Sequence, residues 1–238
     1  MDITCETTVA DVATLHPATI KVFQQYHIDF CCGGKIPLAD ACARHGVNLE
    51  TLLADLRAAM ITPAETTQWE DATLTDLIAY IQQRYHVPLR TELGRLSAML
   101  TTVVSRHGER LPEVLVPLQA TFERFQYDLI DHMHKEDNVL FPAITALEAA
   151  HNAGESPGGR WTGIDQPIQV MEAEHEAAGV ALATLREITR GYAPPEDACP
   201  TFRGLYHGLA ELERDMHIHV HLENNILFPR ATQLAHVT

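Results

Sequence analysis

A stretch of eleven residues occurs twice in this chain and strongly limits what it can fold into. Residues 132–142 read HMHKEDNVLFP, and residues 219–229 read HVHLENNILFP. Residues four apart lie above one another on the same face of an α-helix. Each copy therefore predicts an imidazole beside a carboxylate, which is half of a metal site. The two pairs are His132 with Glu136 and His219 with Glu223.

The apolar residues around each pair predict that this face is buried. They recur in steps of three and four, which is the pattern of an amphipathic helix. An unpaired carboxylate at such a position would cost several kcal/mol, and a bound cation removes that cost. His134 and His221 point about 200° away from this face, at ~100° per residue, so we do not select them as ligands. The two stripes are Leu115, Leu118, Phe122, Phe125, Leu129, His132, Glu136 and Val139, and Phe202, Leu205, Leu209, Leu212, Met216, His219, Glu223 and Ile226.

The remaining sequence predicts an all-α protein, because it contains almost no alternating strand pattern. Four long amphipathic segments with mostly short connections suggest an up-down-up-down four-helix bundle. Pro88 lies inside the first segment, where we expect either a simple bend or a widened entrance to the bundle. The four segments are expected at 74–106, 112–149, 166–190 and 199–234.

The first part of the chain predicts a small helical domain, residues 1–60. Pro17 and Pro37 suit the first turns of helices, and Asn48 is placed to cap another. The polar stretch 61–73, ITPAETTQWEDAT, is the expected linker. Residues 74–238 then form the bundle.

Two further histidines, His86 and His175, occupy the same kind of position in the first and third segments. Taken separately, each is more typical of a hydrogen-bonded core histidine than of a ligand. Their depth changes this interpretation, because residues equally far from the turn of an antiparallel hairpin lie level. The pairs His86/His132, His132/His175 and His175/His219 are centred at 109, 153–154 and 197, all inside predicted connections. We therefore predict that the four histidines lie in one layer of the bundle core, with the two carboxylates about one turn from it. The predicted metal ligands are His86, His132, Glu136, His175, His219 and Glu223.

Two adjacent cysteines, Cys31 and Cys32, are followed by Gly33 and Gly34. One interpretation is a pair of small residues in a turn. We favour an accessible thiol pair for redox or iron-transfer chemistry, because glycines leave the sulfurs uncovered and a following helix N-terminus can lower a thiol pKa. The chain has five cysteines and no secretory signal, so a disulfide framework is not expected. The other three, Cys5, Cys42 and Cys199, are expected to be structural.

Net charge and hydropathy exclude several classes of partner. The formal net charge is −15 and lysine and arginine do not cluster, which argues against binding to nucleic acid or an anionic membrane. No apolar run approaches the ~18 residues that a membrane span requires. The acidic N-terminus lacks a signal-peptide core. We expect a cytoplasmic protein.

Four imidazoles and two carboxylates exceed what one tetrahedral zinc ion requires. Shared between two metals with bridging carboxylates, they leave open positions for a small ligand. Mixed nitrogen and oxygen ligands suit non-haem iron, with manganese or zinc as alternatives. Ferritin-like di-iron bundles instead use Glu-x-x-His and more carboxylates.

Residues 74–232 resemble a haemerythrin-like di-iron domain. Residues 1–60, with TVADV, HPAT and DFCCGG, resemble the N-terminal domain of the repair of iron centres family. The resemblance implies a cytoplasmic bacterial protein that helps restore iron–sulfur clusters after damage by nitric oxide or peroxide. The family's ligands for two iron ions correspond to the same six residues that the helix register selects, and its cysteine pair corresponds to Cys31 and Cys32.

Three functions follow from a di-iron site beside a thiol pair. We favour an iron-handling stress-response protein that supplies iron to damaged iron–sulfur proteins. The first alternative is an enzyme that reduces nitric oxide to nitrous oxide, with electrons from an unidentified donor, because the sequence has no flavin or nucleotide motif. The second is a carrier or sensor of dioxygen or nitric oxide. Enzymatic activity, a homodimer and the docking of the small domain are left open.

Overall fold

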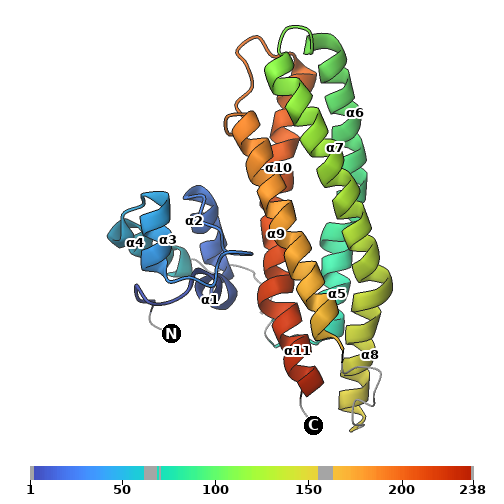
Figure 1. The fold of residues 1–238 in the computed structure, drawn as a ribbon. Coiled ribbons are helices and arrows are strands. Elements are labelled where there is room, and N and C mark those ends of the chain that lie inside the picture. Colours follow the sequence, from blue (N-terminus) through green and yellow to red (C-terminus); the bar gives the residue numbers. More distant parts are fainter. Residues whose placement is uncertain (1–2, 62–68, 70, 155–162, 237–238) are drawn as a thin grey trace.

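A computed structural model describes residues 3–61, 69, 71–154 and 163–236 of the chain. Within these residues the chain is almost entirely helical, and the β pairing consists of an isolated bridge between Thr8 and Pro37. A small helical unit lies beside a long bundle of four rods, as Figure 1 shows. The predicted all-α class and the four-helix bundle are confirmed.

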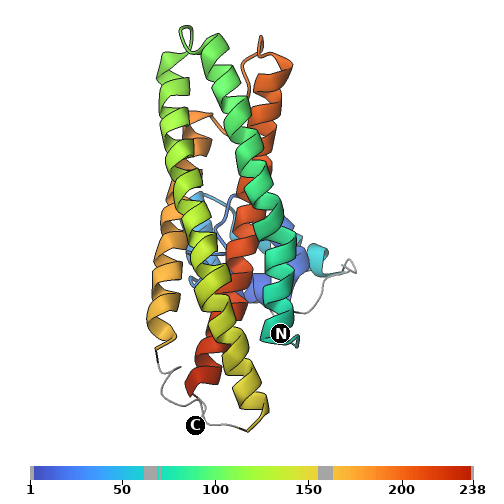
Figure 2. The same ribbon diagram turned by 90° about the vertical axis from the view of Figure 1, so that its right-hand side faces the viewer.

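Each rod of the bundle runs antiparallel to the next along the chain (Figures 1 and 2). The first, second and fourth rods each contain a π-helical turn between two α-helices, whereas the third is one α-helix. In chain order the segments are α5 (Leu74–Ile81), η2 (Gln82–His86), α6 (Val87–His107); α7 (Pro112–Lys135), η3 (Glu136–Leu140), α8 (Phe141–Asn152); α9 (Asp165–Ile188); and α10 (Pro200–Leu222), η4 (Glu223–Leu227), α11 (Phe228–His236).

A proline occupies the second position after each π-helical turn. Proline has no N–H, and its ring clashes with the carbonyl four residues earlier, so a regular α-helical turn is unfavourable before it. A wider turn relieves the clash and keeps the rod continuous. Pro88, which the sequence predicts as a bend or an entrance, follows such a turn. The other two are Pro142 and Pro229.

The π-helical turns change which residues face the core. Val139, expected at the end of the first buried stripe, is 64% exposed, and that expectation is wrong. The extra residue of the wider turn after Glu136 brings Leu140 to the core instead, where it is 3% exposed. Ile226, the equivalent of Val139 in the second copy, is buried in the apolar cluster that also contains Leu222 and Phe228, and α1 of the small unit packs against the same turn. The other expected stripe residues are buried.

Apolar side chains fill the bundle on both sides of one polar layer. In the first rod, Tyr85 belongs to one apolar cluster and Leu89 to the other, with His86 between them. In the fourth rod, Met216 and Leu222 likewise belong to different clusters. The candidate ligands therefore lie in the middle of the core.

The small unit has its own apolar core, which contains Phe23, Phe30, Leu52 and Leu56. The helix that the sequence predicts from Pro17 begins as a short 3-10 turn, and Asn48 accepts a hydrogen bond from the backbone N–H of Thr51 at 3.0 Å, as expected for a cap. The helices are α1 (Val9–Leu15), η1 (Pro17–Thr19), α2 (Ile20–Gln25), α3 (Leu38–His45) and α4 (Leu49–Ile61).

Most of the expected linker, 61–73, lies outside the described residues, so the predicted domain boundaries stay predictions. The first residue of this linker, Ile61, is the last residue of α4. The hydroxyl of its last residue, Thr73, accepts a hydrogen bond from the backbone N–H of Asp76 and caps α5. None of the helices in the described part of the chain is long and apolar enough to cross a membrane.

Candidate metal centre

Six polar side chains meet in the polar layer, and they are the six that the sequence predicts. Each rod contributes one histidine, and the second and fourth rods also contribute one glutamate each. All six side chains are nearly inaccessible, with exposed fractions between 0% and 3%. The residues are His86, His132, Glu136, His175, His219 and Glu223.

The six side chains form two groups of four that share both glutamates. The first group is His86 and His219 with Glu136 and Glu223, and the second is His132 and His175 with the same two glutamates. In each group, one potential ligand atom per residue lies within 4.8 Å of all the others. Each group has the residue types and the spacing to hold one metal ion.

Both carboxylates lie between the two histidine pairs. Glu136 Oε2 is 3.2 Å from His132 Nε2 and 3.5 Å from His86 Nε2. Glu223 approaches His219 Nε2 at 3.0 Å through Oε1 and His175 Nε2 at 3.2 Å through Oε2. The two carboxylates are therefore placed to bridge the groups.

The buried oxygens of the glutamates test whether a cation fits. Both oxygens of Glu136 and Oε2 of Glu223 have no hydrogen-bond partner in the described residues. Burial alone would raise the pKa of Glu223, but the charge and hydrogen bonds of the surrounding histidines hold it well below its usual value. Buried carboxylate oxygens without a partner in an apolar core fit a metal cation.

Three of the four histidines are oriented by a partner at Nδ1. His86 Nδ1 lies 2.8 Å from Asp137 Oδ1, His132 Nδ1 lies 2.9 Å from Glu174 Oε2, and His175 Nδ1 lies 2.8 Å from Asn224 Oδ1. An oxygen acceptor at Nδ1 places the ring proton there and leaves the Nε2 lone pair facing the layer. This is how proteins usually orient metal-binding imidazoles.

Comparisons with known proteins agree with this geometry. Residues 77–231 match the family model described as the hemerythrin HHE cation binding domain, and residues 5–60 match ScdA_N, a domain of unknown function (DUF542). Relatives from Yersinia pseudotuberculosis serotype IB and Yersinia pestis strain Pestoides F are each 39% identical over 215 residues, covering 90% of this chain and 91% of the relative. Both are named iron-sulfur cluster repair protein YtfE.

The chain belongs to the repair of iron centres family.

Sequence reasoning missed the partners at Nδ1, although the repeat contained a signal for two of them. Asp137 and Asn224 hold the same position in the two copies, directly after the glutamate. Asp137 also accepts hydrogen bonds from Gln82 at 2.9 Å and Arg90 at 2.6 Å. Burial would raise the pKa of Asp137, but its hydrogen bonds to His86 and these donors hold it well below its usual range.

His219 differs from the other three histidines. Its Nδ1 has no hydrogen-bond partner among the described residues, and its ring stacks on Tyr85 with the centroids 5.2 Å apart. A cavity of about 230 Å³ is lined by His219, Met216 and Pro88. A groove of about 600 Å³ between α7 and α9 is lined by His132 and His175.

The cysteine pair of this family member lies in a tight turn built around Asp29. Its Oδ1 accepts the backbone N–H groups of Cys31 at 2.8 Å and Cys32 at 3.1 Å, and its Oδ2 accepts that of Gly33 at 2.8 Å. Burial would raise the pKa of Asp29, but these donors lower it. A Cβ at Gly34 would lie 2.7 Å from the Phe30 carbonyl oxygen, so the turn requires glycine there.

The two thiols are not equivalent. Cys31 is 5% exposed, and its Sγ lies 3.2 Å from Asp29 Oδ1 and 3.8 Å from Cys32 Sγ, whereas Cys32 is half-buried. Cys32, burial and Asp29 together raise the pKa of Cys31 well above its usual value. The expectation of two uncovered sulfurs with a lowered pKa is therefore wrong for Cys31, because the glycines shape the turn without exposing this sulfur.

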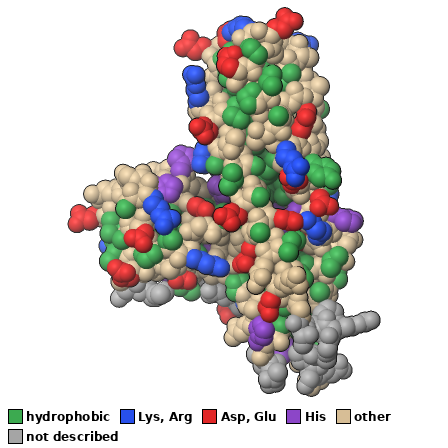
Figure 3. All heavy atoms as spheres, in the orientation of Figure 1, with side chains coloured by type: hydrophobic (Ala, Val, Ile, Leu, Met, Phe, Trp, Pro, Cys, Tyr) green, Lys and Arg blue, Asp and Glu red, His purple; other side chains and the backbone are tan. Residues whose placement is uncertain are grey.

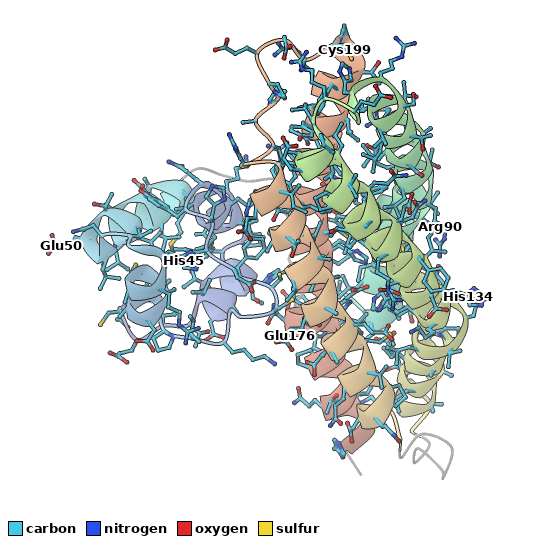
Figure 4. The ribbon with its side chains drawn as sticks, turned by 45° about the horizontal axis from the view of Figure 1, so that its top comes forward. His45, Glu50, Arg90, His134, Glu176 and Cys199 are labelled. Atoms are coloured by element: carbon cyan, nitrogen blue, oxygen red, sulfur yellow. The ribbon has the colours of Figure 1, made fainter. Side chains whose placement is uncertain are left out.

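The thiol turn docks on the second copy of the repeated stretch. His221 Nδ1 donates to the Phe30 carbonyl at 3.2 Å, and Asn225 Nδ2 donates to the Cys31 carbonyl at 3.1 Å. His221 is thus off the metal face, as predicted, but it is buried by the small unit. The equivalent His134 is exposed and lies on the opposite side of the bundle from the small unit (Figure 4).

Proposed function

We propose that the six side chains bind two non-haem iron ions. His86 and His219 would hold one ion, His132 and His175 the other, and the two glutamates would bridge them. The observation that carries this proposal is that both potential sites share two buried carboxylates, and that three of their four oxygens lack a hydrogen-bond partner in the described part of the chain. Manganese and zinc are the alternatives, since the same donor types bind them.

The protein's own groups would orient the histidine ligands and limit the access of water to the ions. Asp137, Glu174 and Asn224 hold three imidazoles with Nε2 facing the layer, and the apolar clusters above and below exclude water from it. Bound iron of this type would supply electron transfer and open positions for a small ligand such as nitric oxide or dioxygen.

We propose that the protein supplies iron for the repair of iron–sulfur clusters damaged by nitric oxide or oxidative stress. The names of the two relatives support this role, as does the docking of a half-buried thiol beside the metal layer. The proposed partners are damaged iron–sulfur proteins of the bacterial cytoplasm. Cys31 and Cys32 would take part in iron or electron transfer.

The deciding experiment is metal analysis with Mössbauer spectroscopy on protein purified without oxygen, combined with a repair assay on a nitrosylated [4Fe–4S] enzyme. We expect two iron ions per chain and recovery of the enzyme. Glu136→Ala and Glu223→Ala should each lose iron. His134→Ala should keep it, because His134 is exposed and lies off the metal-binding face. Protein that binds iron but restores no clusters would contradict the repair function.

Reduction of nitric oxide to nitrous oxide is the second candidate. The cavity at His219 and the groove at His132 and His175 favour it, because both place free space beside candidate ligands. A flavin or nucleotide motif is absent from the sequence, so electrons must come from a partner. Nitrous oxide formed by the reduced protein under anaerobic nitric oxide would support this candidate, and its absence would contradict it.

A further inference from the structure

Asn224 contacts both the candidate metal layer and the thiol turn. Its Oδ1 lies 2.8 Å from His175 Nδ1, and its Nδ2 lies 4.0 Å from Cys32 Sγ. The side chain is 5% exposed. Cys32 and His175, which are far apart in sequence, are therefore separated by a single buried amide.

The orientation of this amide follows from its neighbours. His175 Nε2 faces the candidate metal layer, so an imidazole that binds metal there would use its Nε2 lone pair and carry its proton on Nδ1. That proton requires an acceptor, which fixes the amide oxygen toward His175. The NH₂ group must then face Cys32, whose sulfur can accept a weak hydrogen bond.

The repeat explains why this position holds an amide. The equivalent residue of the first copy is Asp137, which accepts from His86 on one side and from Gln82 and Arg90 on the other. A carboxylate suits that site because every neighbour donates. At Asn224 one neighbour donates and the other is a sulfur, and an amide can both accept and donate.

Asn224 also lines the cleft that gives access to the thiols. The cleft has a volume of about 670 Å³ and lies between the small unit and α9, lined by Cys31, Cys32 and Asn224 among others. Figure 3 shows acidic and histidine side chains along this junction, and Figure 4 places His45 and Glu176 on its two sides. A reagent in the cleft can therefore reach Cys32 while Asn224 separates it from His175.

We propose that Asn224 is a positioning residue that transmits the chemical state of Cys32 to His175. When another group is bonded to the Cys32 sulfur, the hydrogen bond that the sulfur accepts from the Asn224 N–H changes in geometry. The Asn224 side chain then shifts, and so does the geometry of its hydrogen bond with His175 Nδ1–H. Such a bond tunes the imidazole as a ligand. Its consequence for iron handling rests on the proposed function, whereas the coupling itself is a property of the polypeptide.

The test follows the His175 Nδ1–H resonance by NMR in protein labelled with ¹⁵N-histidine. Cys5→Ser and Cys199→Ser remove the other partly exposed thiols. Iodoacetamide then converts Cys32 to a thioether with release of iodide, and mass spectrometry confirms a single modification. Spectra are recorded without metal and with Zn²⁺. We expect the His175 resonance to shift on alkylation, while that of His86 stays in place.

Asn224→Asp is the decisive variant, because it makes the second copy like the first. It keeps the acceptor for His175 and removes the donor to Cys32, so the alkylation-dependent shift should disappear. Asn138→Asp is the matched control, since it makes the same change at an exposed amide of the first copy and leaves the thiol turn docked, and it should keep the shift. Asn224→Ala, which removes both contacts, should also lose it.

A shift in Asn224→Asp or Asn224→Ala as large as that in the starting protein, or no shift in the starting protein, would overturn the proposal. The metal-free spectra separate this result from the proposed function. If Zn²⁺ leaves the histidine resonances unchanged, the metal site is wrong, yet the response of His175 to Cys32 is still measured.

Discussion

At the scale of single residues, each buried histidine of the layer depends on what contacts the other side of its ring. Asp137 holds His86, Glu174 holds His132 and Asn224 holds His175. These partners orient the rings before any cation binds, and they are as much a part of the site as the ligands.

Replacing Asp137 should therefore weaken metal binding without removing a ligand. We expect Asp137→Ala to lower the affinity for Fe²⁺ or Zn²⁺ about 10- to 100-fold, because His86 loses its orientation. Competitive titration with a chromophoric chelator measures the affinity. Asp128→Ala is the control, since Asp128 pairs with Arg124 on the surface. Equal affinities in the two variants would mean that the partner is dispensable.

The two thiols should react at different rates. Cys31 is buried and its pKa is raised well above its usual value, mainly by Cys32, so its thiolate forms only at higher pH. We expect iodoacetamide to modify Cys32 first. The labelling rate of Cys31 should continue to increase with pH at pH values above about 8.5, the ordinary pKa of a thiol. Peptide mapping by mass spectrometry at several pH values gives both rates, and faster labelling of Cys31 would contradict the assignment.

At the scale of elements, the π-helical turns mark the limit of what the sequence pattern predicts. The spacing of His132 and Glu136, the burial of the stripes and the level of the four histidines follow from regular helix geometry, and the structure confirms them. Val139 fails because that geometry changes at the wider turn. The prolines carried the signal, since Pro142 and Pro229 end the two copies of the repeat.

The partners of the ligands and the docking of the thiol turn could not be predicted in the same way. Glu174 and Asn224 act across helices, and His221 and Asn225 act between the bundle and the small unit. Periodicity shows that a residue is off the buried face, but it does not show what covers it. His134 and His221 have the same local pattern and opposite environments.

Replacing the proline after a π-helical turn should affect stability and metal binding in opposite directions. In Pro142→Ala the regular α-helical register becomes accessible, and proline in a helix interior costs about 3 kcal/mol relative to alanine. We expect a higher melting temperature for the metal-free protein and weaker metal binding, because Glu136 begins the turn that would be lost. Thermal melts and metal titration measure the two effects.

Pro117 provides the matched control, because it lies in the same rod inside a regular α-helix. Pro117→Ala should stabilise the protein and leave metal affinity unchanged. If Pro142→Ala bound metal as tightly as the natural sequence, the wider turn would have no role in placing the glutamate.

At the scale of the whole molecule, the bundle encloses six polar groups between two apolar clusters. Both carboxylate oxygens of Glu136 lack a hydrogen-bond partner in the described residues. The fold and the metal are therefore expected to depend on one another.

Chelation of the metal should lower the melting temperature. A ligand present at 100 times its dissociation constant stabilises a protein by about 2.7 kcal/mol, which for a chain of this size is on the order of 5–10 °C. Differential scanning calorimetry before and after removal of the metal, with metal content measured in parallel, tests this. Restoring the metal should restore the melting temperature. An unchanged melting temperature in fully stripped protein would argue against a cation at the centre of the core.

The small unit covers one copy of the repeat and leaves the other in contact with solvent. The two proposed ions would therefore have unlike neighbours. The ion held by His132 and His175 would have Cys32 nearby through Asn224, whereas the ion held by His86 and His219 would have Asp137 behind His86. Stable-isotope replacement of the iron should proceed at two speeds rather than one. A single speed of replacement would mean that the docked turn does not make the two positions unequal.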